Sequence, residues 1–275
     1  MTLSAAQTEG VVALLRQVAA AEIMPRFKHL AAGDVRAKSG PLDPVTIADE
    51  AAERALGSAL GEMFPGVDVM GEEAAAADPA LLRRLGAPGP VWVIDPIDGT
   101  SNFAAELPLF GTMVALVEDN EILAGFIHDP VGGDTAIAIR GGGAWVQSAN
   151  GARRALRAAP PVPVAEMTGA LSWRFLKEPL KTRVVSRMSR LGASFDLRCA
   201  AHQYRMLAAG HCHMLMFRKT LPWDHCAGVL LATEAGAHAA RFDGTPYRPA
   251  DTGGGLLLAP DFPSWRQLRQ ALLAE

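Results

Sequence analysis

The stretch from Val91 to Phe103 carries the residue types that are best suited to chemistry. An apolar run, 91–94, leads into Asp95 and Asp98, and a glycine, two hydroxyl residues and an asparagine follow. We interpret 91–94 as a buried strand that a proline closes, and 95–100 as a turn at its end. Two carboxylates at such a place repel each other unless a cation neutralises them, and Mg²⁺ prefers oxygen ligands. Gly99 allows a ligand to approach the backbone closely, and the N–H groups from Gly99 onward can bind an anion. The pattern therefore indicates metal-assisted phosphate chemistry.

Three further acidic elements lie elsewhere in the chain. Asp49 ends a Val-Thr-Ile-Ala-Asp run, Glu72 and Glu73 follow a glycine, and Asp224 lies within Pro-Trp-Asp-His-Cys-Ala-Gly. Taken singly, each has a structural explanation: a solvated loop for the glutamates, and a helix cap for either aspartate. The neighbours of Asp224, His225 and Cys226, are interpreted as packing residues.

Helices and strands must position these groups, and the apolar periodicity predicts where they lie. In the first half we expect a helix over 5–32, a turn-rich loop over 38–44, and a helix from a cap at Thr46 or Asp49 to about Met63. Strands are expected over 67–70, 91–94, 112–117, 122–128 and 134–140, with a hairpin turn at 118–120 and a break at 141–143. In the second half we expect strands over 168–172, 212–217, 238–242 and 254–259, and helices over 178–191, 200–209, 224–235 and 264–273.

The segment 150–164, rich in Ala, Arg and Pro, is the predicted boundary between two halves, 1–150 and 151–275. The chain has 275 residues, of which 49% are hydrophobic and 20% charged, with a net charge of −3. This balance argues against nucleic acid or anionic membrane as a partner. The sequence shows neither a membrane-spanning run nor a signal peptide, and Cys199, Cys212 and Cys226 form no CxxC pair. We therefore expect a cytoplasmic protein with three reduced thiols.

Together these motifs resemble the inositol monophosphatase family of magnesium-dependent, lithium-sensitive sugar-phosphate phosphatases. The pattern of that family is Gly-Glu-Glu, then Asp-Pro-[Ile/Leu]-Asp-Gly-Thr-x-Asn-Phe, then Trp-Asp-x-x-Ala-Gly. The three parts occur here in order at 71–73, 95–103 and 223–228, and the Lys38 loop and the 45–49 run match a further upstream pattern. The resemblance covers roughly residues 38 to 240. It implies a layered αβαβα sandwich, of the inositol monophosphatase and fructose-1,6-bisphosphatase type, and a homodimer.

The resemblance also implies a set of metal ligands. One Mg²⁺ would be held by Glu72, Asp95 and the carbonyl of Ile97, and a second by Asp95, Asp98 and Asp224. A third, looser ion would be held through Asp49 and Glu72. Most of the ligands would thus lie in the first half, and Asp224 with the specificity region in the second. Two such ions can clamp both oxygens of an in-line phosphoryl displacement.

The implied reaction is hydrolysis of a phosphate monoester by a water that the metal activates. The predicted catalytic residues are Glu72, Thr100 and Asp49, of which Glu72 and the Thr100 hydroxyl orient the water and accept its proton. The N–H groups of Gly99 and Thr100 would cradle the phosphate. The predicted substrate contacts are Ile97, Asp98, Gly99, Thr100, Arg198, Cys199, Ala200 and Asp224.

The chain departs from the family pattern where a substrate's leaving group would bind. Inositol-hydrolysing members have a Glu seven positions before the Trp-Asp aspartate, whereas this chain has Phe217, followed by Arg218 and Lys219. Arg198 also stands where a small residue is more typical. These basic residues either recognise a second anionic group or belong to a surface or dimer interface.

Inositol 1-phosphate is therefore the default substrate. Histidinol phosphate, fructose 1,6-bisphosphate and 3′-phosphoadenosine 5′-phosphate are alternatives. A different class of function is a non-catalytic partner of the transcription machinery, but a protein kept only for docking has no need of a full set of carboxylates.

Overall fold

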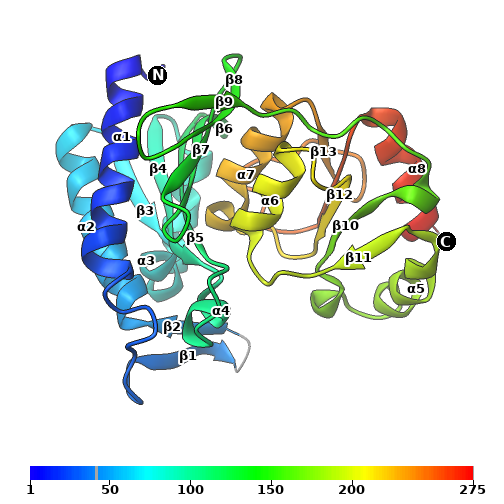
Figure 1. Cartoon of the computed structure of the whole chain (residues 1–275), viewed down its shortest axis with the longest axis horizontal. Helices are drawn as coiled ribbons and strands as arrows, with labels where there is room; N and C mark the ends of the chain where they lie inside the picture. The colour runs from blue at the N-terminus through cyan, green and yellow to red at the C-terminus, as the bar shows by residue number, and fades with distance from the viewer. Residues whose placement is uncertain (41–42, 275) are drawn as a thin grey trace.

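The protein is arranged as five layers, which a computed structural model shows for residues 1–40 and 43–274 (Figure 1). A seven-stranded sheet lies between helices α1 (Ala5–Val18) and α2 (Ile47–Met63) on one face and α6 (Ala200–Ala208) and α7 (Pro222–Glu234) on the other. A five-stranded sheet follows, and α5 (Leu180–Arg187) and α8 (Phe262–Leu272) cover its outer face. The predicted αβαβα sandwich is confirmed.

The seven-stranded sheet has the order β3-β4-β5-β6-β7-β8-β9, and β3 and β4 are its only parallel pair among the described residues. Its strands are β3 (Asp68–Gly71), β4 (Pro90–Asp98), β5 (Gly111–Glu118), β6 (Glu121–Asp129), β7 (Asp134–Ile139), β8 (Gly143–Gln147) and β9 (Arg153–Ala155). The predicted 118–120 turn is confirmed at Asp119 and Asn120, which both adopt positive φ angles of 51° and 60° between β5 and β6. Sequence analysis missed β8 and β9, because the glycine run that breaks β7 is itself a turn that returns the chain to the sheet.

The five-stranded sheet has the order β11-β10-β12-β14-β13. Its strands are β10 (Thr168–Leu171), β11 (Ala193–Phe195), β12 (Met214–Phe217), β13 (His238–Arg241) and β14 (Leu256–Ala259). Strands β10, β12, β13 and β14 were predicted with ends displaced by up to two residues, and β11 was missed because it is only three residues long.

Three expectations in the first half were wrong. The helix predicted over 5–32 ends as α1 at Val18, and a π-helical segment, Ala19–Ile23, follows it. Pro25 explains this early end, because proline lacks the N–H that a continuing helix needs and crowds the turn before it. The loop predicted over 38–44 is largely a hairpin of β1 (Val35–Gly40) and β2 (Asp43–Thr46); its residues 41 and 42 lie outside the described residues.

The strand β4 does not stop at Pro96 as predicted but continues to Asp98. The pairing of β4 with β5 shifts register between Asp95 and Asp98, which marks a bulge at the proline. The missing N–H of Pro96 is tolerated in such a bulge because the regular ladder of hydrogen bonds is interrupted there. The Pro96 carbonyl instead accepts a hydrogen bond from Thr112 Oγ1 at 2.9 Å.

The alternation of side chains along β4 sets the direction in which Asp95 points. Trp92 and Ile94 belong to the hydrophobic cluster that contains α1 and α2, whereas Val91 and Val93 belong to the cluster that contains α6 and α7. Since successive strand residues point to opposite faces, Asp95 continues the second series. The carboxylate of Asp95 is therefore directed toward α7, the helix that carries Asp224.

Candidate metal and phosphate site

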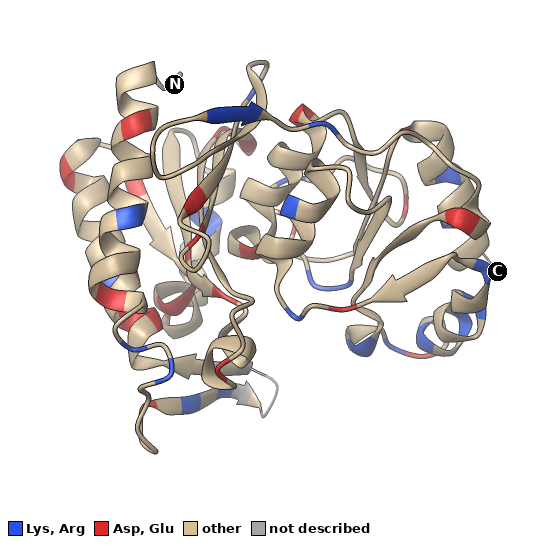
Figure 2. Ribbon diagram, in the orientation of Figure 1, with Lys and Arg blue, Asp and Glu red and all other residues tan. Residues whose placement is uncertain are grey.

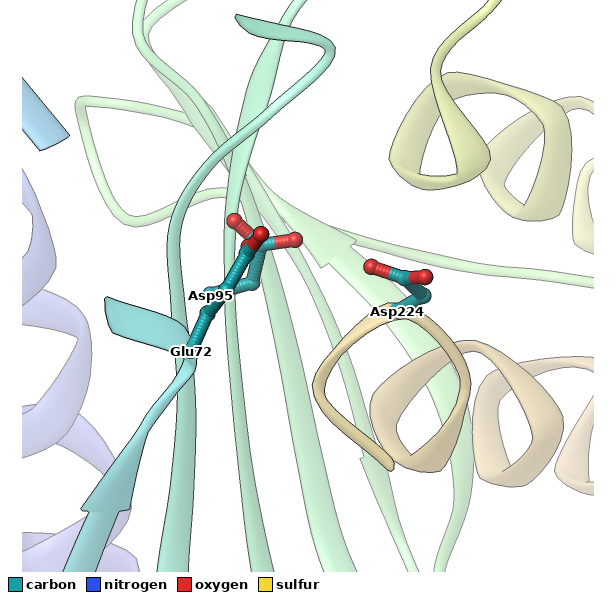
Figure 3. Close-up of side chains that lie close together, drawn as sticks. All are labelled: Glu72, Asp95 and Asp224. Carbon is teal, nitrogen blue, oxygen red and sulfur yellow. The ribbon is translucent and has the colours of Figure 1, made fainter. Parts of the chain in front are cut away.

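Three carboxylates from three elements converge at the carboxyl ends of β3 and β4. Glu72 opens the short helix α3 (Glu72–Ala77), Asp95 lies on β4, and Asp224 lies in the first turn of α7 (Figure 3). One oxygen of each lies within 4.8 Å of the corresponding oxygen of the other two. The structure thus brings together residues that are more than 150 positions apart in the sequence.

Asp95 is buried beside the negative charges of the neighbouring carboxylates. Its side chain is 2% exposed to solvent, and no described residue donates a hydrogen bond to its buried Oδ1. Burial, and then the charges of Glu72, Asp98 and Asp224, raise the pKa of Asp95 well above its usual range. Such an arrangement of unpartnered oxygen and mutual repulsion fits a divalent cation, which would satisfy both at once.

Lys38 supplies positive charge to the same cluster. Its Nζ lies 2.6 Å from Glu72 Oε1 and 2.7 Å from Glu73 Oε1. Although burial opposes it, the charges and hydrogen bonds of the two glutamates raise the pKa of Lys38 above its usual range. Burial nevertheless raises the pKa of Glu72 and that of Glu73 to about 7, so one lysine does not compensate all the carboxylates.

Glu53 fixes the turn that presents Glu72, and sequence analysis missed it. Its carboxylate, from α2, accepts hydrogen bonds from the N–H groups of Glu73 and Ala74, both at 2.8 Å, and so caps α3 from outside. A Cβ at Gly71 would lie 2.1 Å from the Glu53 carboxyl carbon. The Gly-Glu-Glu motif therefore needs its glycine for space, and the tertiary cap is invisible in the sequence because Glu53 is 18 residues away from Gly71.

Asp49 and Thr100 form a second hydrogen-bonded unit beside the cluster. Thr46 is the N-cap of α2, and its N–H and hydroxyl lie 2.8 and 2.6 Å from Asp49 Oδ2. The Thr100 hydroxyl lies 3.2 Å from Asp49 Oδ1 and 2.9 Å from the carbonyl oxygen of Ile97. Asp49 is 1% exposed, and burial raises its pKa to about 6. The aspartate thus serves both as the third residue of the helix cap and as a hydrogen-bond acceptor for Thr100.

Asp98 faces the start of α6. Its Oδ2 accepts hydrogen bonds from the Ala201 N–H at 2.6 Å and from Cys199 Sγ at 2.9 Å. Burial raises the pKa of Asp98, while these hydrogen bonds lower it. Asp98 is not one of the three converging carboxylates, and one of its oxygens holds the 199–201 turn in place.

Gly99 allows the tight approach of this turn to β4. It adopts φ 89°, and a Cβ there would lie 2.9 Å from the Leu109 carbonyl oxygen and 3.1 Å from Cys199 Cβ. The short helix α4 (Thr100–Ala104) begins directly after it. Asn102 secures the other side, because its Nδ2 donates to the carbonyls of Leu109 and Leu197, both at 2.8 Å.

The prediction that His225 and Cys226 are packing residues is confirmed. His225 is 2% exposed, and its ring nitrogens lie 2.8 Å from the Tyr204 hydroxyl and 2.9 Å from the Lys219 carbonyl oxygen. Burial lowers the pKa of His225 to about 3, so the ring is neutral and Nε2 donates to the carbonyl. The three cysteines are all free and buried, in agreement with the prediction of unpaired thiols.

Part of this site lines a cavity of about 670 Å³. The lining includes the charged groups of Lys38, Glu72, Asp98 and Asp224, together with Cys199, Ala200 and Phe217. No helix in the described part of the chain has the length and apolarity that a membrane span requires.

Proteins of one family resemble this chain in sequence and in fold. The inositol monophosphatase family model matches residues 6–274. An inositol-1-monophosphatase of Mycobacterium leprae is 34% identical over 247 residues, covering 88% of this chain and 81% of the relative. A fructose-1,6-bisphosphatase/inositol-1-monophosphatase of Thermotoga maritima is 31% identical, covering 77% and 76%. A solved IMPase from Thermotoga maritima superposes with a TM-score of 0.80 at 24% identity, covering 97% of this chain and 96% of that one.

The layered fold and the carboxylate cluster together define a metal-dependent phosphatase of the αβαβα class. The chain belongs to the inositol monophosphatase family and is a phosphoric monoester hydrolase.

Proposed function

We propose that this protein hydrolyses a small phosphate monoester in a Mg²⁺-dependent reaction, with inositol monophosphate, converted to inositol and phosphate, as the default substrate. The observation that carries the proposal is the convergence of Glu72, Asp95 and Asp224 within 4.8 Å around an unpartnered carboxylate oxygen. An all-oxygen donor set of this charge suits Mg²⁺ better than metals that prefer nitrogen or sulfur ligands.

We propose two to three ions for this site. The three converging carboxylates would be the core of the ligand set, and Asp98 and the carbonyl of Ile97 would complete it. Asp49, with Glu72, is the proposed partner of a further ion. When bound, the ions would neutralise the cluster and the phosphate and lower the pKa of a coordinated water.

The protein groups would then position and deprotonate that water. Thr100 donates its hydroxyl proton to Asp49 or to the Ile97 carbonyl, which leaves an oxygen lone pair to accept a hydrogen bond from the water. Glu72 is the proposed acceptor of the proton from that water. We assign phosphate contacts to the N–H groups of Gly99 and Thr100, and contacts with the leaving group to Asp224 and to the turn formed by Arg198, Cys199 and Ala200.

Phosphate release from a panel of esters tests this proposal. The panel holds inositol 1-phosphate, histidinol phosphate, fructose 1,6-bisphosphate and 3′-phosphoadenosine 5′-phosphate, each with and without Mg²⁺ and with added Li⁺. We expect turnover that requires Mg²⁺, is inhibited by Li⁺, and falls at least a hundredfold in Asp224→Asn and Asp98→Asn. Glu62→Gln, an exposed carboxylate of α2, is the matched control. Metal-independent turnover, or a folded Asp224→Asn enzyme of near-normal activity, would refute the proposal.

The intact carboxylate cluster favours catalysis over a purely docking role in transcription. We further propose, from the family resemblance, a homodimer that works in the cytoplasm on a small phosphorylated metabolite. Light scattering coupled to size-exclusion chromatography tests the dimer directly. A dimer of the 29.0 kDa chain should have a mass of about 58 kDa.

A further inference from the structure

The cavity that holds the carboxylates has a second, basic wall. Its lining includes Arg174, Arg198, Arg218 and Lys219, with Asp196 as the acidic residue among them. These residues come from the η4 turn (Trp173–Phe175), the segment before α6, and the segment between β12 and α7. Figure 2 shows the same contrast over the molecule, with acidic residues at the lower ends of β3 and β4 and basic residues along the loops of the five-stranded sheet.

One aromatic ring organises two of the cations. The Arg174 guanidinium carbon lies 4.7 Å from the centroid of the Phe175 ring, and Lys219 Nζ lies 5.1 Å from the same centroid. A cation held over an aromatic face is oriented by the ring but keeps its full charge. Phe175 therefore concentrates positive charge on this wall without neutralising it.

The single carboxylate on this wall is already engaged. Asp196 Oδ1 accepts a hydrogen bond from the Arg198 N–H at 2.9 Å, and its Oδ2 lies 3.7 Å from Arg174 Nη1. Arg174 nevertheless has a buried Nε without a hydrogen-bond partner among the described residues. Asp196 thus ties two basic segments together but leaves most of their donors free.

Three of the cations form no ion pair among the described residues, although the charge of Lys219 reaches Asp224 and opposes the rise in the pKa of that carboxyl. Among residues 1–40 and 43–274, no carboxylate lies within 4 Å of the charged groups of Arg198, Arg218 or Lys219. Arg198 also adopts φ 53°, a left-handed conformation that costs a residue other than glycine about 1 kcal/mol. Uncompensated charge together with backbone strain, both in a cavity beside a reactive site, is typical of a binding surface.

We propose that this basic wall binds a second anionic group, a phosphate or carboxylate, on the leaving group of the substrate. The enzyme would then favour esters with two anionic groups, one at the carboxylate end and one at the basic wall. Phe217 supports this reading, because its side chain offers the leaving group an apolar surface, 5% exposed and stacked on Tyr204, in place of a hydrogen-bond acceptor. This inference rests on the proposed phosphatase function and specifies its substrate class.

Matched pairs of esters that differ only in the second anion test the inference. We would measure kcat/KM for fructose 1,6-bisphosphate against fructose 1-phosphate, and for adenosine 3′,5′-bisphosphate against adenosine 3′-monophosphate. At least one pair should favour the bisphosphate by about tenfold or more, the typical worth of one charge-assisted hydrogen bond. In Arg218→Gln and Arg174→Gln, the preference within that pair should shrink by about tenfold. Lys177→Gln is the matched control, because it removes an exposed cation that does not line the cavity.

The outcomes separate this inference from the proposed function. Equal kcat/KM within both pairs, or variants that lower both members of a pair equally, would overturn the inference and leave the phosphatase assignment intact. If the wild-type enzyme turned over none of the four esters and neither inositol 1-phosphate nor histidinol phosphate, the proposed function would fail. If it turned over only the latter two, the proposed function would stand. In both cases calorimetric Kd values for the same pairs would decide the inference. Binding of a bisphosphate about tenfold tighter, lost in Arg218→Gln, would support the basic wall, and equal binding within both pairs would refute it.

Discussion

Replacing Asp95 by Asn should make the metal-free protein more stable and the enzyme inactive. Burial and mutual repulsion raise the pKa of each of the three converging carboxylates, whose oxygens lie within 4.8 Å of one another. Two unit charges at that separation repel by about 3 kcal/mol at an effective dielectric constant of about 20. Because the raised pKa of Asp95 shows that it resists ionisation, only part of this repulsion is present, and we expect a gain of about 2 kcal/mol.

Thermal unfolding with and without Mg²⁺ measures this effect. A gain of about 2 kcal/mol corresponds to a rise in Tm of about 4–8 °C for a chain of this size. The wild-type protein should be stabilised by Mg²⁺ through mass action, whereas Asp95→Asn should lose most of that response together with phosphate release. Glu62→Gln should behave as the wild type in both assays. A metal-free Asp95→Asn protein that melts below the wild type, or one that keeps the full Mg²⁺ response, would refute the cation-site reasoning.

Three further results are expected from the same framework. Burial raises the pKa of Asp49 to about 6, so the folded metal-free protein retains a proton that the unfolded chain releases near pH 4. The contribution of Asp49 to the free energy of unfolding should therefore fall by up to about 3 kcal/mol as the pH rises from about 4 to 7. Urea titrations at each pH should show a fall that is larger by that amount in the wild type than in Asp49→Asn, since the other buried carboxylates titrate in both proteins. Gly71→Ala should lower the free energy of unfolding by about 1–3 kcal/mol and remove most of the activity, since the new Cβ displaces the carboxylate that caps α3. Gly57→Ala in α2 should be neutral or stabilising, because the nearest atom to its Cβ is 3.9 Å away. Denaturation and phosphate release distinguish the two variants, and equal effects would contradict the packing argument. Tyr204→Phe should lower the free energy of unfolding by about 1–2 kcal/mol, because it leaves the buried Nδ1 of His225 unpaired, and kcat should be retained. A large loss of kcat without loss of stability would contradict the packing role assigned to the His225 ring.

Much of the fold follows from local patterns in the sequence. The apolar runs predicted all the long strands of the seven-stranded sheet, and Thr46 was recognised as a possible cap of α2. The errors occurred where a local signal and a tertiary contact disagreed. Pro96 was expected to end β4, but the strand continues through a bulge opposite β5. Of the loop predicted over 38–44, residues 38–40 and 43–44 belong to the paired strands β1 and β2.

The candidate site was predictable in its members but not in its geometry. The family pattern pointed to Glu72, Asp95 and Asp224, and the structure brings these three together. The sequence could not show that Asp98 holds the 199–201 turn or that Glu53 caps α3, because both contacts join segments that are distant in the chain. Sequence spacing records which residues are present, whereas contacts of this kind depend on how the layers pack.

The cavity explains why one chain can carry two opposite clusters of charge. Lys38 compensates part of the acidic end through Glu72 and Glu73, whereas on the basic wall Asp196 pairs only with Arg174, at 3.7 Å, among the described residues. A cation at one end and an anion at the other would each remove a self-repulsion that the metal-free, ligand-free protein bears. The affinities for Mg²⁺ and for a doubly anionic ester should therefore reinforce each other, because Mg²⁺ neutralises the carboxylates that would otherwise repel the ester, and the second anionic group of the ester neutralises the basic end. Calorimetric titration of phosphate with and without Mg²⁺ measures this coupling, and an unchanged phosphate affinity would show that the two ends act independently.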